Sequence, residues 1–117
     1  MLCVAEIGSN HGGSLDAALA LIDAAADAGA GAVKFQAWTP ELMYEEGTSE
    51  IESARKWRMP FDWVPALKAR ASGHGMLFGC SAFDFESLDV VDSYCDFLKV
   101  ASIEATWREF VLAVSRK

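Results

Sequence analysis

Residues 32–36 read Ala-Val-Lys-Phe-Gln, a short apolar run that carries one lysine and follows the glycines Gly29 and Gly31. Similar runs lie at residues 2–7, 76–80 and 97–101. Each run is followed by a segment whose apolar residues recur at helical spacing. Strands that are apolar on both faces and alternate with helices are typical of a parallel sheet covered by helices. The sequence therefore predicts an α/β fold of parallel βα repeats, with four strands and four helices.

Capping residues place the starts of these helices. Ser14 and Asp84 are predicted N-caps, and Asp62 is expected to cap the helix that ends near Gly73. Thr106 and Glu109 match a capping box for the last helix. A long polar connection is predicted at residues 39–60, in which a short helix could lie near residues 50–57.

The length of the chain decides which α/β fold is expected. A (β/α)8 barrel needs about 250 residues, and this chain has 117. We therefore expect one partial domain over residues 1–117, made of barrel strands one to four, or about half of a TIM-type barrel.

Composition excludes several classes of protein. The net charge of −7 and the absence of a basic stripe argue against a nucleic-acid binder. No apolar run is long enough to span a membrane, and no secretory signal precedes the first strand. Cys3, Cys80 and Cys95 lack metal-type spacing, and Cys3 and Cys80 are expected to be buried. A reduced, cytoplasmic setting is the expectation.

Three charged residues stand late in otherwise apolar strands, namely Glu6, Lys34 and Lys99. Burying an unpaired charge is costly, so these groups must be paired or reached by water. One interpretation is that Glu6 pairs with a lysine for structural reasons alone. The other is that all three project into a site at the carboxyl ends of the strands, where barrel enzymes carry out their chemistry. Three such residues on three strands favour the second interpretation.

The segments after these strands are polar as well. Hydroxyl groups and helix N-termini near two lysines predict a phosphate or carboxylate site. Asp84 could instead serve only as a helix cap. His11 is expected to be a hydrogen-bonded loop residue rather than a metal ligand.

Four segments of the chain resemble the N-acetylneuraminate (sialic acid) synthase family in the same order. They are Ala5–Ser14, Gly29–Gln36, Cys80–Asp84 and Phe97–Glu104. The resemblance implies a (β/α)8 barrel that condenses phosphoenolpyruvate with an N-acyl amino sugar aldehyde and releases phosphate.

The same resemblance implies roles for individual residues. Lys34 and Lys99 are expected to bind the phosphate and carboxylate of phosphoenolpyruvate, because a multiply charged anion needs fixed countercharge. Glu6 and Glu104 are expected near the reacting carbons and sugar hydroxyls, where they orient the acceptor or handle protons. The implied substrate-binding residues are Asn10, Gln36, Ser81, Phe83, Asp84 and Ser102.

The chain departs from the family at two positions beside the expected site. Ala82 stands where proline is common, and Ile103 stands where a small residue is usual, so substrate choice could differ. The family also implies a divalent metal, Mn or Mg, held by histidines of later barrel strands that this chain lacks. An arginine from a C-terminal antifreeze-like domain is lacking too.

Three functional hypotheses remain at this point. The first is a sialic-acid-synthase-like enzyme that is inactive as this chain alone. The second is a non-catalytic half-barrel that binds an anionic sugar or phosphate. The third is an aldolase in which Lys34 or Lys99 forms a Schiff base. The open edges of a half-barrel predict a homo-oligomer or a complementing half-barrel as partner.

Overall fold

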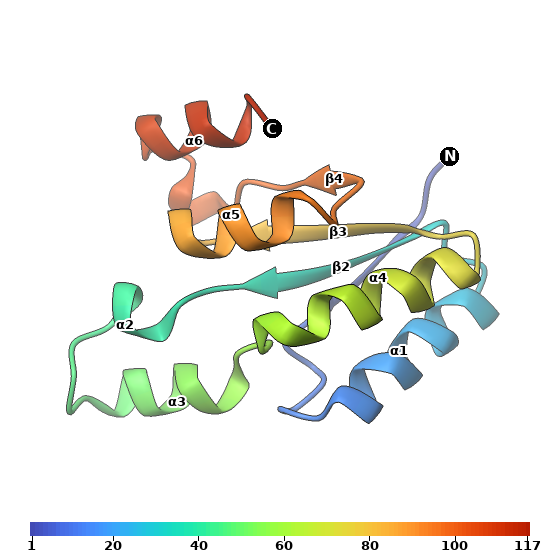
Figure 1. Cartoon of the computed structure of the whole chain (residues 1–117), viewed down its shortest axis with the longest axis horizontal. Coiled ribbons are helices and arrows are strands. Elements are labelled where there is room, and N and C mark those ends of the chain that lie inside the picture. The colour runs from blue at the N-terminus through green and yellow to red at the C-terminus, as the bar shows by residue number, and fades with distance from the viewer.

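A four-stranded parallel sheet forms the centre of the protein, whose residues 1–117 are all described by a computed structural model (Figure 1). The spatial order is β1-β2-β3-β4, so each strand pairs with the next one along the chain. The strands are β1 (Val4–Gly8), β2 (Ala32–Ala37), β3 (Leu77–Ala82) and β4 (Phe97–Leu98). The predicted α/β fold of parallel βα repeats is confirmed.

Six α-helices surround the sheet, against the four that the sequence predicted. They are α1 (Leu15–Asp27), α2 (Pro40–Met43), α3 (Ser49–Trp57), α4 (Val64–Gly73), α5 (Phe85–Asp92) and α6 (Arg108–Val114). The additional helices are α2 and α3, and α3 coincides with the short helix considered for that connection. Figure 1 shows α1 and α4 side by side along the sheet, with α5 and α6 towards β4. No helix combines the length and hydropathy needed to cross a bilayer.

Two of the predicted helix caps are confirmed. The Ser14 hydroxyl accepts a hydrogen bond from the Ala17 N–H (3.2 Å), which caps α1. The Asp84 carboxylate accepts one from the Ser87 N–H (2.7 Å), which caps α5. These side-chain acceptors satisfy N–H groups that have no partner inside the helix.

The predictions of the other two helix caps are wrong. Asp62 lies inside a 3-10 turn, Phe61–Trp63, and α4 begins only after it, so its carboxylate caps nothing. The Thr106–Glu109 capping box does not form, because the N-cap position of α6 is Trp107. The Trp107 ring stacks on Phe110 with 5.1 Å between ring centroids, and this packing replaces a polar cap.

The strand boundaries differ from the prediction at β3 and β4. β3 continues to Ala82, because β2 pairs with it along its whole length. β4 ends at Leu98, three residues before the predicted end, since it is an edge strand that bonds only to β3. A 3-10 turn at Ser102–Glu104 then leads towards α6.

The hydrophobic core lies between the sheet and the helices α1, α4 and α5. Phe35 and Phe78 meet there, with ring centroids 5.8 Å apart, and both are fully buried. Cys80 is buried in this core as predicted, whereas Cys3 is exposed. The prediction for Cys3 is wrong because the residue precedes β1, and only its backbone carbonyl reaches the sheet region.

Candidate functional site

A lysine, a carboxylate and a hydroxyl from the first three strands meet in the structure. Lys34 and Glu6 are register partners on β2 and β1, and Lys34 Nζ lies 2.5 Å from Glu6 Oε2. Lys34 Nζ also donates a 2.8 Å hydrogen bond to Ser81 Oγ on β3. We call these three residues the Lys34 cluster. The structure thus brings together three of the residues that the sequence singled out.

The two charges of this cluster differ in their access to water. The Lys34 side chain is only 11% exposed, whereas that of Glu6 is 50% exposed. A buried ammonium needs a partner, and Glu6 supplies one. The ion pair therefore joins an almost buried cation to a carboxylate that water can reach.

A left-handed glycine allows Gln36 to stand beside Glu6. Gly8 has φ +59° and lies at the register shift between β1 and β2. A Cβ at this position would lie 3.3 Å from Glu6 Oε1 and 3.6 Å from Gln36 Cδ. The glycine therefore leaves room for both side chains at the mouth of the site.

Asp84 has a structural role in this fold. Besides capping α5, its carboxylate accepts hydrogen bonds from the Thr39 N–H (2.7 Å) and from Thr39 Oγ1 (3.2 Å). Asp84 is buried, and both of its oxygens are used within the protein. It fastens the end of β2 to the start of α5, and its role in binding substrate remains a prediction.

The residues after β4 form a second group of charges. Lys99 and Ser102 are exposed, while Glu104 is buried and its Oε2 has no hydrogen-bond partner. Burial raises the pKa of Glu104, and the charge of Lys99 partly opposes this shift. No hydrogen bond or ion pair joins these residues to the Lys34 cluster.

The loop after β1 places Asn10 and His11 in different environments. Asn10 is exposed in a turn, where its N–H donates to the Ile7 carbonyl. His11 is buried beside Trp63, and its Nδ1 accepts from the Gly13 N–H (3.1 Å). Burial lowers the pKa of His11, which favours the neutral ring. His11 is thus a hydrogen-bonded loop residue, as predicted.

A cavity of about 420 Å³ opens next to the Lys34 cluster. All four strand ends contribute to its wall, through Ser9, Gln36, Trp38, Phe83 and Ile103. The opposite wall comes from the segment that contains α2 and α3, through Met43, Tyr44, Glu50, Ser53, Ala54 and Trp57. The sequence indicated the strand-end residues Gln36 and Phe83 but missed the second wall.

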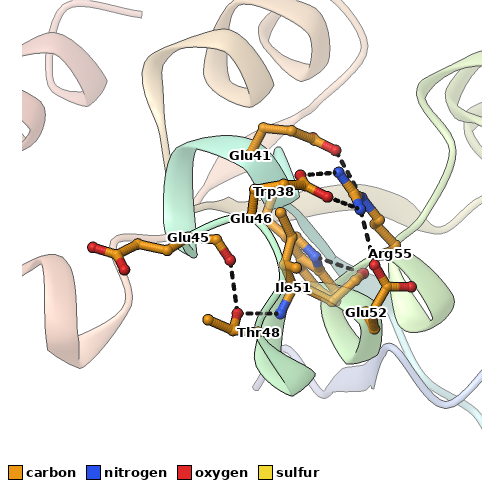
Figure 2. Close-up of polar contacts among 9 residues, drawn as sticks. Trp38, Glu41, Glu45, Glu46, Thr48, Ile51, Glu52 and Arg55 are labelled. Carbon is orange, nitrogen blue, oxygen red and sulfur yellow. Dashed lines mark hydrogen bonds and ion pairs between the residues drawn. The ribbon is translucent and has the colours of Figure 1, made fainter.

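Polar contacts hold α2 and α3 in place. Figure 2 shows the Arg55 guanidinium pointing at three carboxylates, with distances of 2.9 Å to Glu41, 2.7 Å to Glu46 and 2.9 Å to Glu52. Trp38 Nε1 donates a 3.1 Å hydrogen bond to the Ala54 carbonyl, which ties α3 to the end of β2. The wall is therefore attached to the sheet. The one local signal of α3 in the sequence was Thr48, whose hydroxyl caps the helix by accepting a hydrogen bond from the Ile51 N–H.

The histidines, cysteines and carboxylates of this chain do not make up a divalent-metal site. No group of three such residues lies close enough together to hold an ion. The oxygens of Asp84 are already used, and the carboxylate of Glu6 is paired with Lys34.

Comparison with known proteins gives a consistent result. A sequence profile of the NeuB family matches residues 21–117. The spore coat polysaccharide biosynthesis protein SpsE of Bacillus subtilis (strain 168) is 34% identical over 97% of this chain. A pseudaminic acid synthase of Campylobacter jejuni is 30% identical over 97% of it. The crystal structure of an N-acetylneuraminic acid (sialic acid) synthetase from Leptospira borgpetersenii, in complex with citrate, superposes with a TM-score of 0.87 at 32% identity over 97% of this chain.

These relatives are much longer than the chain. It spans 34% of SpsE, 38% of the pseudaminic acid synthase and 40% of the Leptospira protein. The four parallel strands correspond to part of a barrel, in agreement with the predicted fold class.

Proposed function

The chain belongs to the NeuB family of sugar-acid synthases, and from that premise we propose that it provides the anion-binding part of a synthase site. The proposed reaction condenses phosphoenolpyruvate with an N-acyl amino sugar aldehyde and releases phosphate. The observation that carries this proposal is the Lys34 cluster, in which an almost buried ammonium stands at the strand ends beside a cavity.

The Lys34 cluster has the chemistry that phosphoenolpyruvate requires. Lys34 supplies a fixed positive charge and Ser81 a hydroxyl, both held in place before any ligand arrives. Charge that is already oriented in a partly dry site stabilises an anion more than a mobile surface charge does. In this proposal Lys99 and Ser102 bind the same anion from the segment after β4.

The two glutamates have different proposed tasks. Glu6, half exposed and beside Gln36, orients the hydroxyls of the acceptor sugar. Glu104 is buried with a raised pKa, so it keeps a proton more readily than an ordinary carboxyl. A carboxyl that holds its proton more readily is suited to act as a general acid. Asn10, Phe83 and Asp84 are proposed to support the substrates.

The Schiff-base hypothesis is weakened by the contacts of Lys34. A nucleophilic amine must lose its proton, and desolvation without a counterion favours that loss. Lys34 Nζ instead lies 2.5 Å from the Glu6 carboxylate and donates a hydrogen bond to Ser81, so it is already engaged by two partners. The pairing therefore supports electrostatic binding rather than covalent catalysis.

The metal, the partner and the location belong to the same proposal. These residues form no site that could hold Mn or Mg, and the 117 residues are expected to show no turnover alone. β1 and β4 each bond to one neighbouring strand, so we expect pairing with a second copy or with a complementing half-barrel. The three free thiols support a reducing, cytoplasmic location.

Calorimetric titration with phosphoenolpyruvate tests the proposal. Binding is expected at millimolar ligand and is expected to be lost in Lys34→Ala. Lys117→Ala is the control, because Lys117 pairs with Asp89 on the surface and lies outside the site.

Several outcomes would count against the synthase. No binding at millimolar ligand favours a half-barrel without this function. Borohydride trapping of a carbonyl substrate on Lys34 or Lys99 favours the aldolase. Release of phosphate from phosphoenolpyruvate, once a complementing half and an amino sugar are supplied, supports the synthase.

A further inference from the structure

The cavity beside the Lys34 cluster differs from that cluster in its chemistry. Seven of its 11 lining residues are hydrophobic, and none is a lysine or arginine. Glu50 is its one acidic residue, so the cavity repels anions. It is therefore unsuited to phosphate or carboxylate groups and fits a neutral, partly apolar ligand.

Aromatic side chains dominate the walls. Trp38 and Phe83 meet edge to face, with ring centroids 6.2 Å apart and planes at 89°, on the strand side. Trp57 and Tyr44 stand on the opposite side, and each is 41% exposed. Large aromatic side chains left open to water next to a cavity mark a binding surface rather than a core.

Packing holds Trp57 at its place on the rim. A Cβ on Gly12 would lie 3.6 Å from the Trp57 ring, so the ring covers the loop after β1. Lys56 Nζ lies 5.1 Å from the ring centroid and also restrains it. An aromatic ring that is already fixed loses little entropy when a ligand packs against it.

The position of the cavity relates it to the acceptor sugar of the proposed reaction. Gln36 lines the cavity and also stands beside Glu6 across Gly8. A ligand that touches Gln36 therefore reaches the Lys34 cluster at one end and the aromatic wall at the other. The volume of about 420 Å³ is near the lower end of the ~300–1,000 Å³ range of small-molecule sites, which suits one monosaccharide.

We propose that the wall built by α2 and α3 binds the N-acyl group of the acceptor sugar, with Trp57 and Tyr44 as specificity-determining residues. This inference rests on the proposed function and names which part of the substrate the cavity recognises. The acyl group packs against the aromatic rings, while the sugar hydroxyls face Gln36, Ser9 and Glu6.

A graded series of ligands tests the proposal. Mannose, N-acetylmannosamine, N-propanoylmannosamine and N-butanoylmannosamine are titrated into the protein by calorimetry or ligand-observed NMR. Affinity is expected to rise about threefold to fourfold for each added methylene, the ratio that burial of one methylene gives. Trp57→Ala is expected to weaken binding of the N-butanoyl sugar by about tenfold and to flatten the series.

Matched variants separate recognition from folding. Trp107→Ala removes a tryptophan that is 40% exposed, nearly as much as Trp57, but lies outside the cavity. It is expected to leave the series unchanged. Trp57→Phe retains a ring and is expected to keep most of the dependence on acyl length, with an unaltered circular dichroism spectrum.

The results of this experiment and of the phosphoenolpyruvate titration can be told apart. Three results would overturn the acyl-site proposal. They are an affinity that does not change with acyl length, an affinity of Trp57→Ala equal to that of the wild type, and no sugar binding at millimolar ligand. If phosphoenolpyruvate still binds in those samples, the proposed function stands and only the acyl site is wrong. If phosphoenolpyruvate fails to bind while the acyl series holds, the cavity recognises acyl sugars and the proposed reaction is wrong.

Discussion

The Lys34 cluster and the segment after β4 each contain a lysine, a glutamate and a serine, but they differ in which of these side chains are buried and paired. Lys34 is almost buried, and it is paired with Glu6 and hydrogen-bonded to Ser81. Lys99 is exposed, and Glu104 is buried with an unpaired oxygen. The difference follows from the sheet, because Lys34 lies on β2 between two neighbouring strands, whereas Lys99 lies beyond the end of the edge strand β4. Strand pairing on both sides gives a charged side chain its partners.

The comparison also assigns different roles to the two regions. A site whose charges are already paired and oriented is ready to bind a ligand. A buried carboxyl without a partner is destabilising until something else satisfies it. The first region is therefore organised in this structure, and the second is organised only when a ligand or a further strand supplies the missing contacts.

The largest effect is expected from removing the carboxylate that fastens the central strands to α5. Asp84→Ala leaves the Thr39 and Ser87 N–H groups without an acceptor, at a cost of about 3 kcal/mol in the free energy of unfolding. Urea unfolding measures this change. Asp89→Ala, at an exposed position of the same helix, is the control and should cost less than about 0.5 kcal/mol. Equal losses would show that the network around Asp84 is not what organises the central region.

The next largest effect concerns binding, and it compares the two lysines directly. Lys34→Ala is expected to weaken phosphoenolpyruvate binding about a hundredfold, or ~2.7 kcal/mol, since it removes a desolvated charge. Lys99→Ala is expected to weaken it about fivefold, because an exposed charge acts through water. Calorimetry on both variants gives the ratio. A larger loss for Lys99 would reverse the comparison and place the main anion contact on the segment after β4.

A smaller effect is expected where β4 packs against β3. A Cβ on Gly79 would lie 2.3 Å from the Phe97 ring, so Gly79→Ala must displace that ring from its place against β3. Overpacking of this kind costs about 1–3 kcal/mol. Gly73→Ala is the same substitution at the end of α4, with nothing within 4 Å, and it should stabilise by about 0.5 kcal/mol. Thermal unfolding measures both changes in stability. If Gly79→Ala stabilises the protein as Gly73→Ala does, β4 is not packed against Gly79.

The smallest effect is the pH dependence due to Glu104. Its pKa is raised in the folded state, so folding favours the protonated carboxyl. The contribution to stability is therefore fully present below the ordinary value of 4.5 and is lost as the pH rises through the folded pKa. Glu104→Gln, which stays neutral, should match the wild type in acid and exceed it in stability at neutral pH.

Urea unfolding at the two pH values measures this difference. Glu109→Gln at an exposed position of α6 controls for the general loss of one negative charge. If Glu104→Gln is no more stable than the wild type at neutral pH, the carboxyl has a partner and the two regions are more alike than the structure indicates.

Much of the fold and the centre of the site follow from local patterns. Short apolar runs separated by helical repeats predict the parallel sheet, and the similar positions of Glu6 and Lys34 within neighbouring parallel strands bring them together. The N-cap role of Asp84 depends on residues within one turn of a helix. These features are predictable because the contacts that produce them are close in sequence or are repeated.

The features that the sequence missed depend on longer-range packing. Arg55 stabilises α2 and α3 through Glu41 and Glu46, which lie 14 and nine residues away. The hydrogen bond from Trp38 to the Ala54 carbonyl, which fixes the cavity wall against β2, has no local signature, although Thr48 marks the start of α3. β4 is short because it is an edge, and Trp107 displaces a polar cap by stacking on Phe110.

The attachment of α2 and α3 has a consequence for how such a protein can change over time. The Trp38 indole joins this segment to the end of β2, while Trp57 covers the loop after β1. None of its residues belongs to the Lys34 cluster. Mutations at Tyr44 or Trp57 can therefore remodel one wall while the anion site stays intact. If this segment forms the acyl site as proposed, we expect substitutions within residues 40–58 to change which sugar binds without changing the binding of the anion.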